Sequence, residues 1–177
     1  LLASNESKHP WLDEGFAEYT CTIIENSLLG KETKDPLRSS YNRYFRLALS
    51  GKEQPMSTHA DRFLYNSSYS TSTYSKGALV LAQLKYIIGE DNFNETLKRY
   101  FKDWAFKHPT PNDFIRSAEK TSGIELEWFL TDWTQTVNTI DYAVKSIETF
   151  KAKSEQIAAE TGIKISLERI GLMPMPV

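Results

Sequence analysis

Apolar residues recur with a helical period over most of the first 135 residues of the chain. After Pro10, for example, Leu12, Phe16 and Tyr19 follow one another at intervals of three and four residues, so they lie on one face of a helix. The same period, bounded by glycines or capping residues, recurs five more times. We therefore expect helices in residues 10–30, 35–51, 76–89, 91–104, 110–123 and 126–135.

Three of these helices have recognisable start signals. Asp35-Pro36 and Asp91 each offer a capping carboxylate, and the first of them adds a first-turn proline. The stretch 110–113, Thr-Pro-Asn-Asp, combines a capping hydroxyl, a first-turn proline and a carboxylate three residues after the cap. The helix within residues 78–88 is apolar on almost all sides, and we expect it to be buried.

Residues 52–73 show no sustained period. They contain Pro55 and the hydroxyl-rich run Asn66–Thr73, and both features are typical of irregular structure. We therefore expect a long loop between the second and third helices.

Near residue 140 the spacing of the apolar residues changes from that of a helix to a repeat of two residues, which is typical of a strand. Ile163, Ile165 and Leu167 alternate with polar residues, and residues 142–147 show a weaker form of the same alternation. The charged, alanine-rich segment between them, residues 151–162, is compatible with a short helix or a loose connection. We expect a mainly α fold with a short C-terminal β-hairpin, and a domain boundary between residues 1–139 and 140–177.

The composition narrows the classes of function. Of the 177 residues, 40% are hydrophobic and 25% are charged, as in average globular domains. The formal net charge is −2, whereas proteins that bind nucleic acids concentrate basic residues on their surface, so we expect no nucleic-acid partner. No apolar stretch approaches the roughly 18 residues that span a bilayer, and the single cysteine, Cys21, excludes a disulfide within the chain.

The first stretch with chemical interest is residues 11–19, Trp-Leu-Asp-Glu-Gly-Phe-Ala-Glu-Tyr. Glu14 and Glu18 lie four residues apart and share one face of the predicted helix. An amphipathic helix with two solvated carboxylates would explain this pattern. Gly15 argues against that explanation, because glycine in a helix costs about 1 kcal/mol relative to alanine. A close approach of another backbone, or a metal site, would account for it.

The second such stretch is residues 69–78, which runs from Tyr69 through Tyr74 and Lys76 to Ala78. A hydroxyl-rich loop that enters a buried helix, with Tyr74 packed at the junction, would explain it structurally. A phenol is protonated at neutral pH, so Tyr74 can also donate a hydrogen bond.

Together the two stretches resemble the zinc metallo-aminopeptidases of the aminopeptidase N and leukotriene hydrolase type, which are gluzincins. In that family a Trp-Leu-Asn-Glu-Gly-Phe-Ala stretch supplies the third zinc ligand, and a Tyr-x-Lys-Gly-Ala signature supplies a catalytic tyrosine. The resemblance implies that Glu14 is a Zn²⁺ ligand and Tyr74 the catalytic tyrosine, and it makes Tyr69 and Glu18 candidate cleft residues. Asp13 departs mildly from the usual asparagine. The implied fold is the helical subdomain of a thermolysin-like metallopeptidase catalytic domain, followed by the opening strands of a β-sandwich.

The other two zinc ligands of that family come from a His-Glu-x-x-His helix, and the chain contains no such segment. His9 lies five residues before Glu14, which is the wrong spacing for one helical face. His108 precedes a proline, which favours a surface or capping role, and nothing in the sequence decides the role of His59. We therefore expect a piece of a larger peptide-hydrolysing enzyme that holds no zinc and is inactive by itself. A non-catalytic helical interaction or scaffold module is the alternative. The sequence decides neither side-chain specificity nor cellular compartment.

A piece of a larger domain should also expose apolar surface where the remainder docks. We expect that surface on the helices within residues 11–19 and 76–88, and it would allow self-association.

Overall fold

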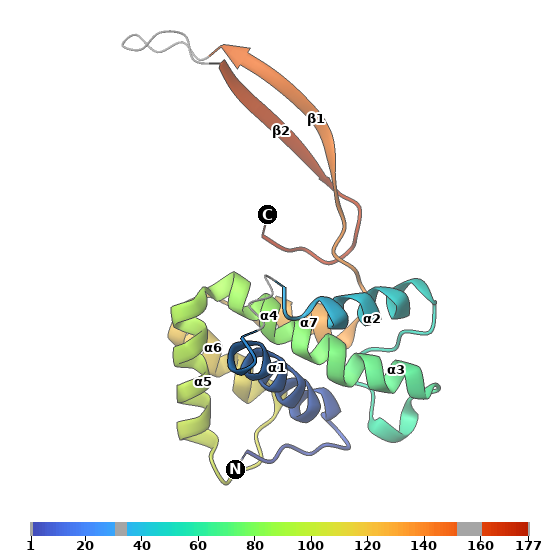
Figure 1. The fold of residues 1–177 in the computed structure, drawn as a ribbon, viewed down its shortest axis with the longest axis vertical. Helices are drawn as coiled ribbons and strands as arrows, with labels where there is room; N and C mark the ends of the chain where they lie inside the picture. The colour runs from blue at the N-terminus through green and yellow to red at the C-terminus, as the bar shows by residue number, and fades with distance from the viewer. Residues whose placement is uncertain (1, 31–34, 152–160, 177) are drawn as a thin grey trace. The chain divides into compact units, whose positions relative to one another are not determined.

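The computed structural model describes residues 2–30, 35–151 and 161–176, which form two compact units (Figure 1). The first unit, Leu1–Val137, is helical, and the second, Asn138–Val177, contains a two-stranded sheet. Each unit is described below by itself. No helix among the described residues is long and apolar enough to cross a membrane.

The helical unit follows the predicted order of helices closely. Its elements are α1 (Pro10–Leu28), α2 (Arg38–Leu49), a 3-10 helix (Ala60–Arg62), α3 (Asn66–Ser70), a π-helical turn (Thr71–Lys76), α4 (Gly77–Ile88), α5 (Glu90–Trp104), α6 (Pro111–Ser122) and α7 (Glu127–Gln135).

Helix α4 forms the centre of this unit and packs against α1, α2 and α5. Its residues Leu79, Val80 and Leu84 are fully buried, as the apolar run within residues 78–88 predicted. Aromatic rings extend the core on one side, where the ring of Phe114 in α6 lies 4.9 Å from that of Phe16 and 5.2 Å from that of Tyr100. Each buried aromatic ring removes a large apolar area from water, so these contacts contribute strongly to the core.

The boundaries of α6 confirm its start and stop signals. The residues of a capping box are in place, since the backbone N–H and the hydroxyl of Thr110 both donate hydrogen bonds to Oδ2 of Asp113, and Pro111 occupies the first turn. At the other end Gly123 has a φ of 71°, a left-handed conformation that glycine adopts without a Cβ penalty.

Two predicted helix starts were wrong by one to three residues. Helix α2 begins at Arg38 and not at Asp35-Pro36, where the chain forms a turn instead, and α5 begins at Glu90, one residue before Asp91. A carboxylate or a proline favours several neighbouring start positions, and the packing of the apolar face selects among them.

The predicted loop over residues 52–73 was wrong in its last third. The hydroxyl-rich run forms α3 and the first half of the π-helical turn, which continues directly into α4. Ser68, Ser72 and Thr73 are buried there. Their small side chains let the backbone pack tightly. Because these buried residues are polar by type, the apolar pattern of the sequence did not predict this helix.

The predicted location of exposed apolar surface was also wrong. Trp11 and Leu12 are buried, and most of α4 is buried as well, because α1 and α4 pack against each other. On α1 the exposed large apolar residues are Ile23, Ile24 and Leu28, in the last turns of the helix.

The second unit confirms the predicted hairpin. Strands β1 (Tyr142–Lys151) and β2 (Thr161–Arg169) pair antiparallel, so the ends of the segment 151–162 belong to strands, and residues 152–160 lie outside the described residues. A bulge between Val144 and Ser146 shifts the register by one residue. This shift keeps Val144 and Ile147 on the same face, opposite Leu167 and Ile165, because side chains alternate between the two faces of a strand.

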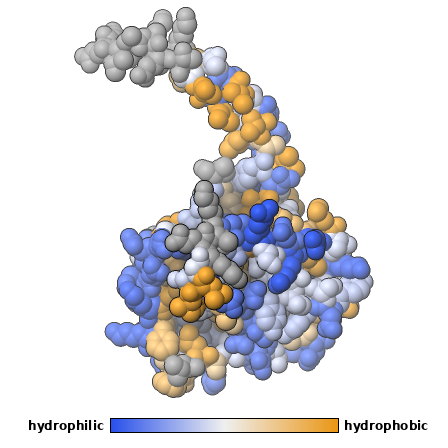
Figure 2. Space-filling model, viewed as in Figure 1, coloured by the Kyte–Doolittle hydropathy of each residue, from blue (hydrophilic) through white to orange (hydrophobic). Residues whose placement is uncertain are grey.

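The shared face of the hairpin is apolar and exposed. More than two fifths of the residue surface is accessible at Val144, Ile147, Ile165 and Leu167, and orange apolar residues follow the hairpin in Figure 2. Two strands alone are marginally stable in water, and a sheet of this kind is normally stabilised by packing on one face.

Candidate active site

The backbones of α1 and α4 meet at two glycines. A Cβ atom built on Gly15 would lie 2.8 Å from the Cα atom of Gly77, and one built on Gly77 would lie 2.7 Å from the Cα atom of Gly15. No real side chain fits at such distances, so only glycine permits this crossing. The close approach of the α4 backbone therefore explains why a glycine occupies position 15 inside a helix.

Beside this crossing, Tyr74 and Glu14 are in direct contact. The Tyr74 hydroxyl donates a hydrogen bond of 2.6 Å to Oε1 of Glu14, although the two residues are 60 positions apart in the sequence. The two candidate residues therefore lie in one place, one on α1 and the other on the π-helical turn before α4.

The environment of Tyr74 keeps its phenol protonated. The hydrogen bond to Glu14 contributes most, followed by desolvation and by the negative charges of Glu14 and Asp13, and together they raise the pKa of Tyr74 to about 12. At neutral pH the group is therefore a hydrogen-bond donor.

The turn that carries Tyr74 has an unusual backbone. Residues Thr71–Lys76 form a π-helical turn between α3 and α4, which are otherwise α-helical. Turns of this type are rare and occur frequently at functional sites.

Of the two candidate cleft residues, Tyr69 lies within electrostatic range of the pair and Glu18 lies one turn further along α1. Desolvation and then the charges of Glu14, Glu6 and Asp13 raise the pKa of Tyr69. Oε1 of Glu18 lies 3.7 Å from Nη1 of Arg43, which forms a loose ion pair between α1 and α2. Desolvation followed by the neighbouring Glu14 and Glu6 raises the pKa of Asp13, so this end of α1 concentrates negative charge.

The structure places the three histidines at three different points of the described chain. Nδ1 of His59 accepts a hydrogen bond from the backbone N–H of Asp61 and caps the 3-10 helix. Nδ1 of His108 lies 2.9 Å from the carbonyl oxygen of Ala3. His9 immediately precedes α1, and burial lowers its pKa.

A zinc site needs about three protein ligands. Across residues 2–30, 35–151 and 161–176, no three His, Cys, Asp or Glu side chains lie close enough together to hold a metal ion. Within those ranges Glu14 is therefore a single carboxylate that could join metal ligands supplied from elsewhere.

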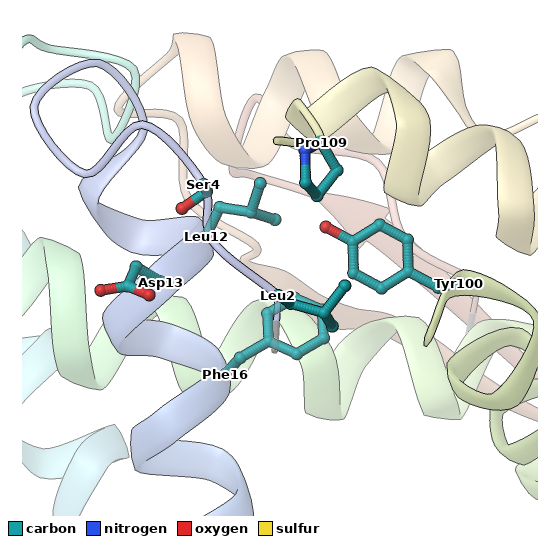
Figure 3. Close-up of a pocket in the computed structure, with 7 residues that line it drawn as sticks. All are labelled: Leu2, Ser4, Leu12, Asp13, Phe16, Tyr100 and Pro109. Carbon is teal, nitrogen blue, oxygen red and sulfur yellow. The ribbon is translucent and has the colours of Figure 1, made fainter. Parts of the chain in front are cut away.

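A cavity of about 140 Å³ lies on another side of α1 (Figure 3). Leu12 and Phe16 of α1 line it with Tyr100 of α5 and with Pro109, and the Tyr100 hydroxyl points towards Pro109. Neither Glu14 nor Tyr74 lines this cavity, so it is separate from their hydrogen bond.

The sequence analysis assigned no role to one notable pair of residues. Lys76 is fully buried, and its Nζ atom lies 2.7 Å from Oε1 of Glu53. A lysine directly before the apolar run that begins at Gly77 could have signalled a buried charge, but its partner 23 residues away could not be read from the sequence.

Comparisons with known proteins give a consistent result. The family model "Peptidase family M1 domain" matches residues 2–133, about three quarters of the chain. Among curated proteins, the chain is 28% identical over 169 residues to aminopeptidase N of Streptomyces lividans, and 28% identical over 161 residues to glutamyl aminopeptidase of Sus scrofa. It covers 19% and 16% of these proteins, whereas they match 87% and 82% of the chain.

Solved structures show the same fold. An M1 zinc metallopeptidase of Deinococcus radiodurans, bound to a Tyr-Ser-Ala substrate, matches 72% of this chain with a TM-score of 0.57 and 23% identity. The match covers 27% of that protein.

Proposed function

Because this chain belongs to peptidase family M1, we propose that it forms the helical part of the catalytic domain of a zinc-dependent aminopeptidase, which removes N-terminal residues from peptides. The observation that carries the proposal is the 2.6 Å hydrogen bond between Tyr74 and Glu14, since it brings the two chemically distinctive motifs of the chain together.

Tyr74 has the properties of an oxyanion donor. Its phenol is protonated at neutral pH, and the crossing of α1 and α4 fixes its position. A donor aimed at the oxygen that becomes negative during peptide hydrolysis stabilises the transition state, and one such donor is typically worth about 10²–10³ in rate.

Glu14 has the properties of a metal ligand. A carboxylate has two oxygens, so one can accept the hydrogen bond from Tyr74 while the other binds a metal. When bound, zinc in such enzymes makes a coordinated water acidic enough to act as a nucleophile near neutral pH. Because the chain supplies one ligand, we infer that these 177 residues alone neither hold zinc tightly nor hydrolyse peptides.

Tyr69 and Glu18 are proposed to line the substrate cleft. Tyr69 is within electrostatic range of Glu14, and Glu18 follows Glu14 by one turn of α1. Both can contact a peptide bound next to the Glu14–Tyr74 pair.

The second unit is proposed to be the opening of a β-sandwich domain. Its apolar face needs a packing partner, which further strands would provide. Without such strands the same face would favour self-association.

The sequence upstream of residue 1 in the intact protein provides the first test. A His-Glu-x-x-His segment there supports the enzyme, and its absence would favour a non-catalytic interaction module.

Kinetics of the intact protein provide the second test. With an aminoacyl chromogenic substrate, Tyr74→Phe should lower kcat and kcat/KM together by about 10²-fold or more, with KM nearly constant. Glu14→Gln should lower zinc content as well as activity. The matched control is Tyr86→Phe, because Tyr86 is an exposed tyrosine on α4 and should retain full activity. A Tyr74→Phe enzyme within a few-fold of the wild type would remove Tyr74 from catalysis.

A further inference from the structure

The π-helical turn carries a buried ion pair on the side away from Glu14. The Lys76 side chain has no exposed surface and that of Glu53 has 5%, and the Nζ–Oε1 distance is 2.7 Å. Glu53 lies in the segment that follows α2, so this pair joins the turn to a distant part of the chain.

The rest of the Lys76 environment is also well defined. Its Nζ atom lies 5.3 Å from the centre of the Tyr44 ring, which allows a cation–π contact. The Tyr44 ring in turn packs on Trp133 of α7, at 6.3 Å between ring centres. Desolvation lowers the pKa of Lys76, while the charge and hydrogen bond of Glu53 oppose that shift.

Stability alone gives little reason to keep such a pair. The free-energy cost of removing two charges from water is about as large as the attraction between them. Well-packed apolar residues of similar volume therefore often stabilise a fold equally well or better. A buried pair does, however, require one specific arrangement of its two partners, and this requirement can fix the register of the segments that carry them.

The register of this turn determines the position of Tyr74. Lys76 follows Tyr74 by two residues, which corresponds to about half a helical rotation, so the two side chains leave the turn on nearly opposite sides. Lys76 reaches Glu53 and Tyr44 on one side, and Tyr74 reaches Glu14 on the other. A rotation of the turn about its axis would break both contacts together.

We propose that Lys76 and Glu53 are positioning residues, whose ion pair holds the π-helical turn in the register that brings the Tyr74 hydroxyl onto Glu14. The relevance of this register to catalysis rests on the proposed function, but the structural claim can be tested without any enzyme activity.

The test is a double-mutant cycle measured in two backgrounds. Tyr74→Phe, Glu14→Ala and the combination are made in the wild-type chain, and unfolding by urea gives the coupling between the two residues, because each single variant removes the hydrogen bond. The same cycle is repeated with Lys76→Met and Glu53→Leu together, which removes both buried charges and leaves none unpaired.

In the wild-type background we expect a coupling of about tenfold in the unfolding equilibrium constant, as for a hydrogen bond to a charged group. In the apolar background it should fall below about twofold, even if the overall stability is unchanged. The matched control is Lys98→Met with Glu95→Leu, because that pair has the same 2.7 Å distance but is exposed on α5. The control background should keep the tenfold coupling.

Three results would overturn the proposal: an unchanged coupling in the apolar background, no coupling in the wild type, or an apolar variant that does not fold, since the pair would then serve the fold as a whole. If instead the proposed function is wrong, the experiments give a different combination of results. If Tyr74 has no role in catalysis, the kinetics of Tyr74→Phe are normal while the outcome of these cycles is the same.

Discussion

The crossing of α1 and α4 predicts a large effect from a single added methyl group. In Gly15→Ala the new Cβ atom would lie 2.8 Å from both the carbonyl carbon and the Cα atom of Gly77. Non-bonded carbon atoms pack at about 3.5 Å or more, so the two backbones would have to separate by roughly 0.7 Å. Because the opposing atoms belong to the backbone, no side-chain rotation can relieve the overlap.

Two opposing effects decide the stability of Gly15→Ala. Alanine is better than glycine inside a helix by about 1 kcal/mol, so the substitution would stabilise α1 if space were available. Forcing an extra methyl group into a packed interior costs about 1–3 kcal/mol. Gly15 and Gly77 are both buried and meet backbone to backbone, which favours the upper end of this range. We therefore expect a net loss of about 2 kcal/mol in the free energy of unfolding.

Urea denaturation followed by far-UV circular dichroism measures this loss. The matched control is Ala17→Gly, an exposed position of the same helix, which should cost about 1 kcal/mol and so calibrates helix propensity in α1. A Gly15→Ala chain as stable as the wild type, or more stable, would show that the backbones do not meet at these glycines.

Three further predictions concern other parts of the chain. Thr110→Ala removes the capping box of α6 and should lower the free energy of unfolding by about 1 kcal/mol in urea denaturation; no change would mean that the cap contributes nothing. Burial raises the pKa of Tyr100 above its usual value of 10.0, so its contribution to stability is complete below that pH and is lost as the pH rises through the folded-state pKa. The melting temperature should therefore fall less steeply above about pH 10 in Tyr100→Phe than in the wild type, and identical profiles would contradict this assignment. Isothermal titration of the chain with Zn²⁺ at neutral pH should reveal no one-to-one site of submicromolar affinity, because one carboxylate cannot hold the ion against water; a tight site abolished by Glu14→Gln would refute it.

The helices could be predicted wherever an apolar face and a start or stop signal coincided. Helix α6 is the clearest case, since Thr110, Pro111 and Gly123 each perform the local role that their residue types favour. The hairpin could also be predicted, because Ile163, Ile165 and Leu167 alternate strictly and their period is that of a strand.

The π-helical turn could not be predicted, although it carries Tyr74. Its residues Ser72 and Thr73 are polar by type and yet buried, so hydrophobic periodicity gives no signal. What stabilises the turn is its surroundings, including an ion pair to Glu53 that no local pattern contains. Tertiary contacts here override the local preference of hydroxyl-rich sequences for loops.

The family resemblance placed Glu14 and Tyr74 in one site, and the chain's own glycines explain how they meet. Gly15 directly follows Glu14, and Gly77 follows Tyr74 by three residues, which is about one helical turn. Where two helices cross without side chains between them, residues adjacent to the crossing or one turn away come within hydrogen-bond distance, as the 2.6 Å contact shows. Each motif therefore contains both one partner of this hydrogen bond and the glycine that lets the other motif approach. A substitution at either glycine should separate the Tyr74 hydroxyl from Glu14 while leaving both groups chemically intact.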